Sequence, residues 1–228
     1  MLAKALKPNR LEAAKDVAAE FINGRPNDNI GITLFAGETF TQCPLTVDHA
    51  VLLDMIHNIK CGLITDGTAV GMGIANAVTR LKDSKAKSKV IILLTDGTNN
   101  KGDISPMTAA EIAKSFGIRV YTIGVGTNGM APYPYPVGNT VQYVSMPVEI
   151  DEKTLTEIAG TTDGNYFRAT SNSKLKEVYE EIDKLEKTKL NVKEYSKRDE
   201  EYHWFALAAF LCVLLEVLLR NSVLKKIP

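Results

Sequence analysis

The stretch Lys89 to Gly97, KVIILLTDG, gives the strongest indication of the fold. It is a continuous apolar run that ends in Thr95, Asp96 and Gly97. Half-exposed strands alternate apolar and polar residues, whereas parallel strands covered on both faces read as unbroken apolar runs. We therefore predict a buried parallel strand over Lys89–Thr95, with Asp96 projecting from its carboxyl end.

The segments on either side of this strand alternate between helical and strand periodicity. Expected helices cover Pro8–Gly24, Asp48–Lys60, Thr68–Leu81, Met107–Phe116, Glu152–Ala159 and Ser173–Leu190. Expected further strands cover Ile30–Ala36, a short stretch around Phe40, Arg119–Val125 and Asn165–Arg168. Parallel strands need helical crossovers that cover both faces of the sheet, so the pattern predicts a doubly wound, mostly parallel α/β sheet.

The segment Gly126 to Ile150 breaks the alternation. It combines several prolines with Tyr133, Tyr135 and Tyr143, which predicts an irregular loop or surface excursion. Exposed tyrosines often anchor interfaces, so Tyr133 and Tyr135 form either a recognition surface or a contact with their own domain.

Composition narrows the class of protein. The chain has 228 residues, with 27 Lys and Arg against 27 Asp and Glu, and 45% of its residues are hydrophobic. A formal charge of zero gives no electrostatic reason to expect nucleic-acid binding. Cys43, Cys61 and Cys212 lie far apart without a CxxC pair, so we predict small apolar side chains and no zinc site or disulfide framework.

The C-terminal part of the chain reads differently from the rest. Residues 202–219, YHWFALAAFLCVLLEVLL, would form a helix about 27 Å long, close to the hydrocarbon thickness of a bilayer. A buried core helix is the alternative, favoured by Glu216, although Glu216 can pair with Arg220 near the end of the span. The basic tail then places Pro228 in the cytoplasm and the main domain on the other side of the membrane.

These observations divide the chain into four parts. We expect a main domain over residues 1–186, a charged linker over 187–201, a transmembrane helix over 202–220 and a basic tail over 221–228.

Ligands of a doubly wound sheet gather beyond the carboxyl ends of its strands. Asp96 projects there, and Thr68 stands at the start of the helix that follows Gly67. A hydroxyl and a carboxylate are hard oxygen donors of the kind that Mg²⁺ prefers. The alternatives are a turn-forming role for Asp96 before Gly97 and an N-cap role for Thr68 or Asp66. Two ligands do not complete a metal site.

Four motifs together resemble a von Willebrand factor A (VWA) domain. They are LLTDG at 93–97, DGTAVGMGIANA at 66–77, IRVYTIGVGT at 118–127 and GNYFRAT at 164–170. PNRLEAAK near the start, FAGETFTQCPLT, the Pro/Tyr segment and the terminal LKKIP are similar to the Bacteroides aerotolerance (Bat, BatA-like) subfamily. The resemblance implies a metal-ion-dependent adhesion site for Mg²⁺, with Thr68 and Asp96 as metal ligands.

The resemblance also implies a motif that this chain lacks. The family's first central strand ends in DxSxS, and Met1 falls right after the position where that motif should end. We therefore expect an N-terminally truncated VWA domain, in which Ile30–Ala36 and Lys89–Thr95 lose the strand between them.

The resemblance implies a membrane-anchored protein-interaction module and not an enzyme. Its implied partners are other membrane VWA proteins and a MoxR-type AAA+ ATPase, although an ATPase works in the cytoplasm, on the opposite side from the predicted periplasmic domain. A non-functional fragment of a longer protein is one alternative.

The other alternative is a phosphotransfer enzyme of the haloacid dehalogenase type, because TDGT occurs at 65–68 and 95–98. The nucleophilic aspartate of that class would fall on Ile64 and Leu94, which cannot attack phosphorus. A nucleotide-binding loop and a triad hydrolase also lack their motifs.

Overall fold

The computed structural model describes residues 1, 6, 8–127, 129–137, 140–148, 150–195, 207–213, 216, 217 and 219. The chain divides into two compact units, Met1–Glu186 and Lys187–Pro228. The first unit carries the strands and helices that position the candidate site.

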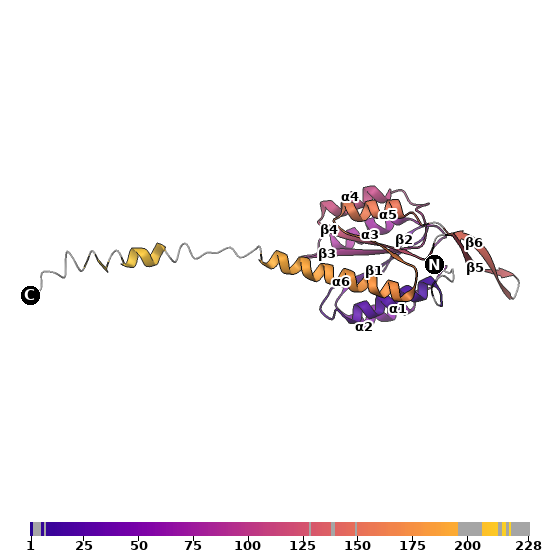
Figure 1. The fold of residues 1–228 in the computed structure, drawn as a ribbon, viewed down its shortest axis with the longest axis horizontal. Helices are drawn as coiled ribbons and strands as arrows, with labels where there is room; N and C mark the ends of the chain where they lie inside the picture. Colours follow the sequence, from indigo (N-terminus) through magenta and orange to yellow (C-terminus); the bar gives the residue numbers. More distant parts are fainter. Residues whose placement is uncertain are drawn as a thin grey trace, which may run out of the picture. The chain divides into compact units, whose positions relative to one another are not determined.

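The elements follow one another in nearly the predicted order (Figure 1). The helices are α1 (Arg10–Asn23), α2 (His49–His57), α3 (Val70–Leu81), α4 (Pro106–Ser115), α5 (Glu152–Thr161) and α6 (Asn172–Tyr195). The strands are β1 (Ile30–Phe35), β2 (Thr39–Thr46), β3 (Lys89–Thr95), β4 (Ile118–Val125), β5 (Gly129–Val137), β6 (Thr140–Val148) and β7 (Tyr166–Ala169).

Three parallel strands form the centre of the domain in the order β3-β4-β7. One face of this sheet packs against α3, α4 and α5 through a core that includes Ile91, Val120 and Ile158. The other face packs against α1 and α6 through a core that includes Tyr121 and Ile123. Helices on both faces of a parallel sheet confirm the predicted α/β class.

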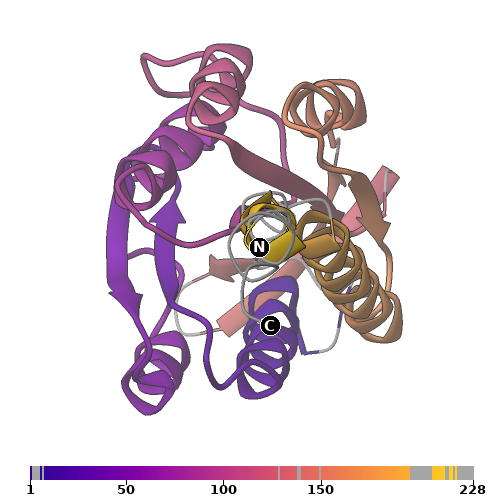
Figure 2. The ribbon, with the colours of Figure 1, turned by 90° about the vertical axis from the view of Figure 1, so that its left-hand side faces the viewer.

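The strands β1 and β2 form a separate antiparallel pair. A third core cluster, which includes Ile22, Cys43 and Leu52, joins this pair to α1 and α2. Of the three cysteines, Cys43 is buried, and Cys61 and Cys212 are exposed. Figure 2 shows this violet pair set apart from β3. Among the described residues no strand joins β1 to β3.

The predicted burial of β3 holds in full on one face and only in part on the other. Ile91, Leu93 and Thr95 are buried, but Val90, Ile92 and Leu94 are only partly covered. β3 pairs with β4 on one side, and no described strand covers its other side. Side chains of an edge strand lose the cover that a second neighbour would give, which explains the intermediate exposure.

The prediction of an irregular segment over Gly126–Ile150 is also wrong. β5 and β6 pair antiparallel along their whole lengths, from Gly129 opposite Val148 to Val137 opposite Thr140. Proline is compatible with such a ribbon at positions whose N–H would point away from the partner strand. The prolines of this segment are therefore compatible with a strand.

The predicted end of the closing helix is wrong. The closing helix α6 ends at Tyr195 instead of Leu190, so residues 187–195 are helical. Most of the predicted span over 202–220 lies outside the described residues. Within the described part of the chain, no helix is both long and apolar enough to cross a bilayer.

Candidate functional site

The two candidate ligands predicted from the sequence meet at the carboxyl end of β3. Asp96 follows the last residue of that strand, and its side chain is about one-fifth exposed, at 21%. Thr68 approaches the same turn: a Cβ built on Gly97 would lie 3.5 Å from Thr68 Oγ1. The structure thus brings the hydroxyl and the carboxylate to one edge of the sheet.

Backbone contacts hold the loop before α3 against the loop after β1. The Ala69 N–H donates to the Ala36 carbonyl at 2.7 Å, and the Gly37 N–H donates to the Thr65 carbonyl at 2.7 Å. Gly67 has a φ of 145°, and a Cβ there would lie 2.9 Å from the Gly37 Cα. Glycine at position 67 therefore permits both the backbone conformation and the close approach of the two loops.

Two asparagines that sequence reasoning missed fix Thr68 in place. Asn100 Oδ1 accepts from the Thr68 N–H at 2.9 Å, and Asn99 Oδ1 accepts from the Val70 N–H at 2.8 Å. The Thr68 carbonyl in turn accepts from the Asn100 N–H at 3.0 Å. The loop after β3 thereby satisfies backbone donors at the start of α3.

The N-cap role predicted for Thr68 or Asp66 is wrong. The N-cap position of α3 is Ala69, which has no side-chain cap hydrogen bond. The acceptor comes from Asn99, which is distant in sequence but adjacent in the fold. The Thr68 hydroxyl is consequently not used as the cap.

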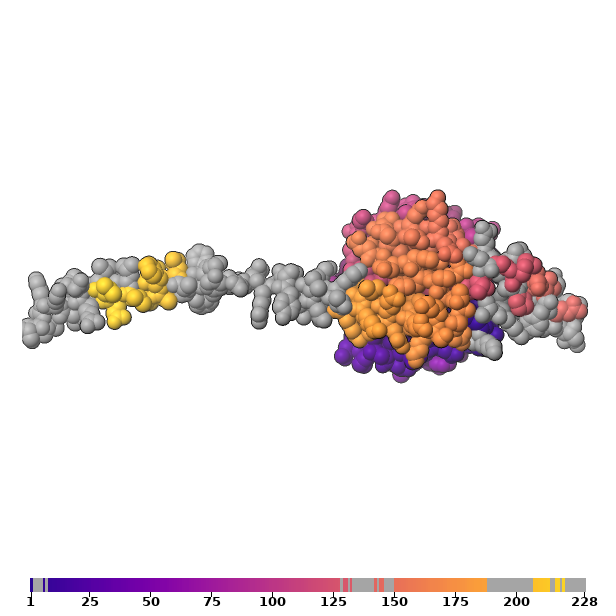
Figure 3. Space-filling view, in the orientation of Figure 1, coloured from indigo at the N-terminus to yellow at the C-terminus, as the bar shows by residue number. Residues whose placement is uncertain are grey.

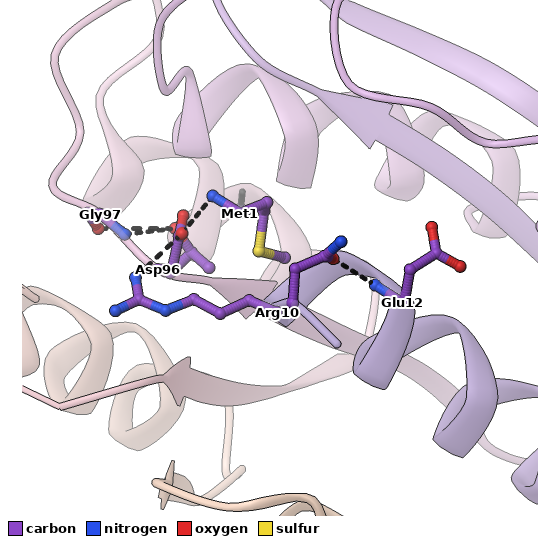
Figure 4. Close-up of polar contacts among 7 residues, drawn as sticks. Met1, Arg10, Glu12, Asp96 and Gly97 are labelled. Atoms are coloured by element: carbon purple, nitrogen blue, oxygen red, sulfur yellow. Dashed lines mark hydrogen bonds and ion pairs between the residues drawn. The ribbon is translucent and has the colours of Figure 1, made fainter. Parts of the chain in front are cut away.

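A third missed residue, Arg10, pairs with Asp96 (Figure 4). Arg10 Nη1 donates to Asp96 Oδ2 at 3.1 Å, from the first residue of α1. The side chain of Arg10 is 1% exposed. The Met1 amino group forms a further ion pair with the same carboxylate oxygen. Asp96 therefore lies between two cationic groups.

The guanidinium of Arg10 fits beside Gly126, at the carboxyl end of β4. Gly126 has a φ of 114°, and a Cβ there would lie 2.6 Å from Arg10 Cζ. Arg10 Nε and Nη2 are buried without a hydrogen-bond partner among the described residues. Arg10 thus bridges the ends of two neighbouring parallel strands through one ion pair and one close backbone contact.

The chemistry of this site is that of oxygen donors with a compensating cation. Thr68 and Asp96 suit Mg²⁺ in kind. However, a buried guanidinium already neutralises Asp96, and a nearby positive charge opposes the binding of a metal cation. Among the described residues, no group of three or more His, Cys, Asp or Glu side chains is placed to hold a metal. The pair by itself therefore does not fit a bound Mg²⁺.

Comparisons with known proteins identify a matching family and similar structures. The family described as von Willebrand factor type A domain matches residues 4–181. BatB from Bacteroides thetaiotaomicron is 33% identical with a TM-score of 0.71, covering 82% of this chain and 93% of that one. An aerotolerance-related membrane protein from Bacteroides fragilis is 33% identical with a TM-score of 0.69, covering 81% of this chain and 93% of that one.

A curated relative is longer than this chain. An uncharacterized protein from Borreliella burgdorferi is 27% identical over 220 residues, which cover 96% of this chain. The match spans 64% of that relative's own length.

Proposed function

The chain belongs to the von Willebrand factor type A domain family, and on that premise we propose that it is a membrane-anchored protein-interaction module. VWA domains are generally interaction modules and not enzymes. The proposed partner-binding surface of this chain is the edge of the sheet where Thr68 and Asp96 lie. The convergence of these two side chains from separate loops is the observation that carries the proposal.

In this proposal Thr68 and Asp96 would supply two of the ligands of Mg²⁺. In an adhesion site of this kind, the cation would supply positive charge that an acidic group of the partner recognises. Because Arg10 compensates Asp96, further oxygen ligands from outside the pair would have to contribute. Calorimetry with MgCl₂ and the chain alone should therefore show no binding of micromolar affinity, and such binding would contradict this view.

The proposed partners are other membrane VWA proteins and a MoxR-type AAA+ ATPase. Membrane anchoring has two supports. A relative with 33% identity is itself a membrane protein. In addition, the described residues 207–213 are helical, with exposed Leu207, Phe210 and Val213. A periplasmic position for the VWA domain remains part of the proposal and rests on the basic tail alone.

The repeated TDGT sequence provides a matched experiment. Asp96 lies in the copy at the end of β3, and Asp66 lies in the copy before α3, where it is exposed. Binding of the full chain to a purified partner VWA protein should weaken at least about tenfold in Asp96→Asn and stay unchanged in Asp66→Asn. Equal affinity of the two variants would contradict the proposed site.

A further inference from the structure

The hairpin formed by β5 and β6 has two chemically different edges. Figure 1 shows it reaching away from the other labelled elements, and the space-filling view shows its described residues projecting (Figure 3). Within the described residues, β5 and β6 pair only with each other. Each strand therefore has one outer edge. The residues at the outward positions determine which backbone donors and acceptors that edge presents.

The register identifies which backbone groups point outward. In an antiparallel pair, residues alternate between positions that exchange hydrogen bonds and positions whose N–H and C=O point to the outside. Val137 pairs with Thr140 across a connection of two residues, and a hydrogen-bonded pair closes such a connection. By the same alternation, the backbone groups of Tyr135 and Tyr133 also hydrogen-bond to β6. The backbone N–H and C=O of the alternate residues point away from β6.

Proline occupies successive outward positions of β5. Pro132, Pro134 and Pro136 lie opposite Ser145, Tyr143 and Val141. Proline has no N–H, so the outer edge of β5 lacks donors at these positions and cannot be extended by another strand. The same prolines cost the hairpin nothing, because their nitrogens face away from β6.

The outer edge of β6 is open by contrast over three successive outward positions. Val141, Tyr143 and Ser145 occupy these positions, and each has both an N–H and a C=O, whereas Pro147 at the next outward position has no N–H. Exposed strand edges are commonly protected by charged side chains. The sequences of β5 and β6, GMAPYPYPV and TVQYVSMPV, contain no charged residue. Charge therefore does not oppose pairing along this edge.

From these edges we propose that β6 pairs antiparallel with β6 of a second copy of this chain. A two-fold axis at Tyr143 places Val141 of each copy opposite Ser145 of the other. That arrangement forms about six backbone hydrogen bonds, two for each of its pairs. The product is a four-stranded sheet whose two outer edges are both β5.

The proline edges are the reason for choosing a second copy as the occupant. A head-to-head pair with the same surface on both sides is closed by symmetry. Because β5 cannot accept a further strand, the assembly stops at two chains. This pairing is independent of the site at Asp96, so either proposal can fail without the other.

Sedimentation analysis of the full chain over a concentration series tests the pairing. We expect a monomer–dimer equilibrium that Tyr143→Pro weakens at least about tenfold, because the substitution removes an outward donor. Tyr143→Thr keeps the backbone N–H and should leave the equilibrium unchanged. A monomeric parent chain, an unaffected Tyr143→Pro dimer, or an equal loss in Tyr143→Thr would each overturn the proposal.

Two further measurements keep this result interpretable. Protection of the Tyr135 and Gln142 amides from hydrogen exchange should persist in Tyr143→Pro, because these residues pair inside the hairpin. The double variant Pro132→Thr and Pro134→Thr restores donors on β5 and should form species larger than a dimer. Failure to assemble further would contradict the role assigned to the prolines.

Discussion

Arg10 and Asp96 form a partly buried ion pair that links the start of α1 to the end of β3, with 3.1 Å between Arg10 Nη1 and Asp96 Oδ2. The two residues are 86 positions apart in sequence. The pair fixes the carboxylate of the candidate site and supplies its compensating charge. Removal of either partner should therefore change both stability and cation binding.

Replacing Arg10 with methionine separates these two effects. Arg10→Met leaves Asp96 without its guanidinium partner, and breaking a buried pair costs about 3–5 kcal/mol, reduced here because Asp96 is 21% exposed. The melting temperature should fall. Because a divalent cation can then replace the lost charge, MgCl₂ should raise the melting temperature of Arg10→Met but not of the parent.

The double variant Arg10→Met and Asp96→Asn is the control for that experiment. It removes the carboxylate as well, so MgCl₂ should have no effect on its melting temperature. A rise equal to that of Arg10→Met alone would show that the cation acts elsewhere.

Gly126 should be intolerant of substitution because Arg10 lies against it. Gly126→Ala places a Cβ 2.6 Å from Arg10 Cζ at a residue whose φ is 114°. The strained backbone and the displaced guanidinium should lower the free energy of unfolding by about 2–4 kcal/mol in urea denaturation. Gly160→Ala is the matched control, since Gly160 lies in α5 and a Cβ there meets nothing within 4 Å.

The control should be neutral or slightly stabilising, because alanine favours the helix by up to about 1 kcal/mol. Equal destabilisation by both substitutions would argue against a specific contact between Gly126 and Arg10.

The apolar run of β3 was sufficient to predict a parallel α/β sheet and the position of Asp96 at its edge. Arg10 was missed because an arginine near the start of an amphipathic helix usually faces solvent. A signal was present: Arg10 precedes Ala13 and Ala14 by about one turn and Val17 by about two turns, on the buried face of α1. A buried arginine requires an anionic partner.

Other features depend on contacts that sequence spacing does not encode. Asn99 and Asn100 lie in the loop after β3 and accept hydrogen bonds from the start of α3. The sequence around Val70 therefore does not indicate these caps. The hairpin was missed because proline usually marks loops. Its regular occurrence at 132, 134 and 136 was the available signal, since a period of two is that of a strand.

Glu186 should make folding stability depend on acid pH. Its carboxylate accepts from Tyr121 Oη at 2.6 Å and Ser88 Oγ at 2.8 Å, and it also pairs with Arg119. Burial alone would raise the pKa of Glu186, but these hydrogen bonds and the guanidinium outweigh burial and lower the pKa below 4.5. The ionised carboxylate is therefore favoured in the folded state.

A lowered pKa in the folded state gives stability that is present above pH 4.5 and is lost as the pH falls through the folded-state value. Glu186→Gln should lower the free energy of unfolding by about 2–3 kcal/mol at neutral pH, the value of hydrogen bonds to a charged group. The difference between variant and parent should shrink in urea denaturation below pH 4.5. Glu181→Gln, an exposed change on α6, should show neither effect, and a constant difference at all pH values would exclude Glu186 as the titrating group.

Asn99 should contribute to stability as a cap supplied from another loop. Asn99→Ala removes the acceptor for the Val70 N–H, and loss of a helix cap costs about 0.5–2 kcal/mol. The lost cap lies at the start of α3, so hydrogen exchange should quicken at the first turn of the helix. The core of α3 is held by its packing against the sheet and should be affected later. Asn29→Ala, at an exposed position before β1, should leave both stability and exchange unchanged. If Asn99→Ala altered neither quantity, the Asn99 side chain would not be the cap, and the position of Thr68 would depend on Asn100 alone.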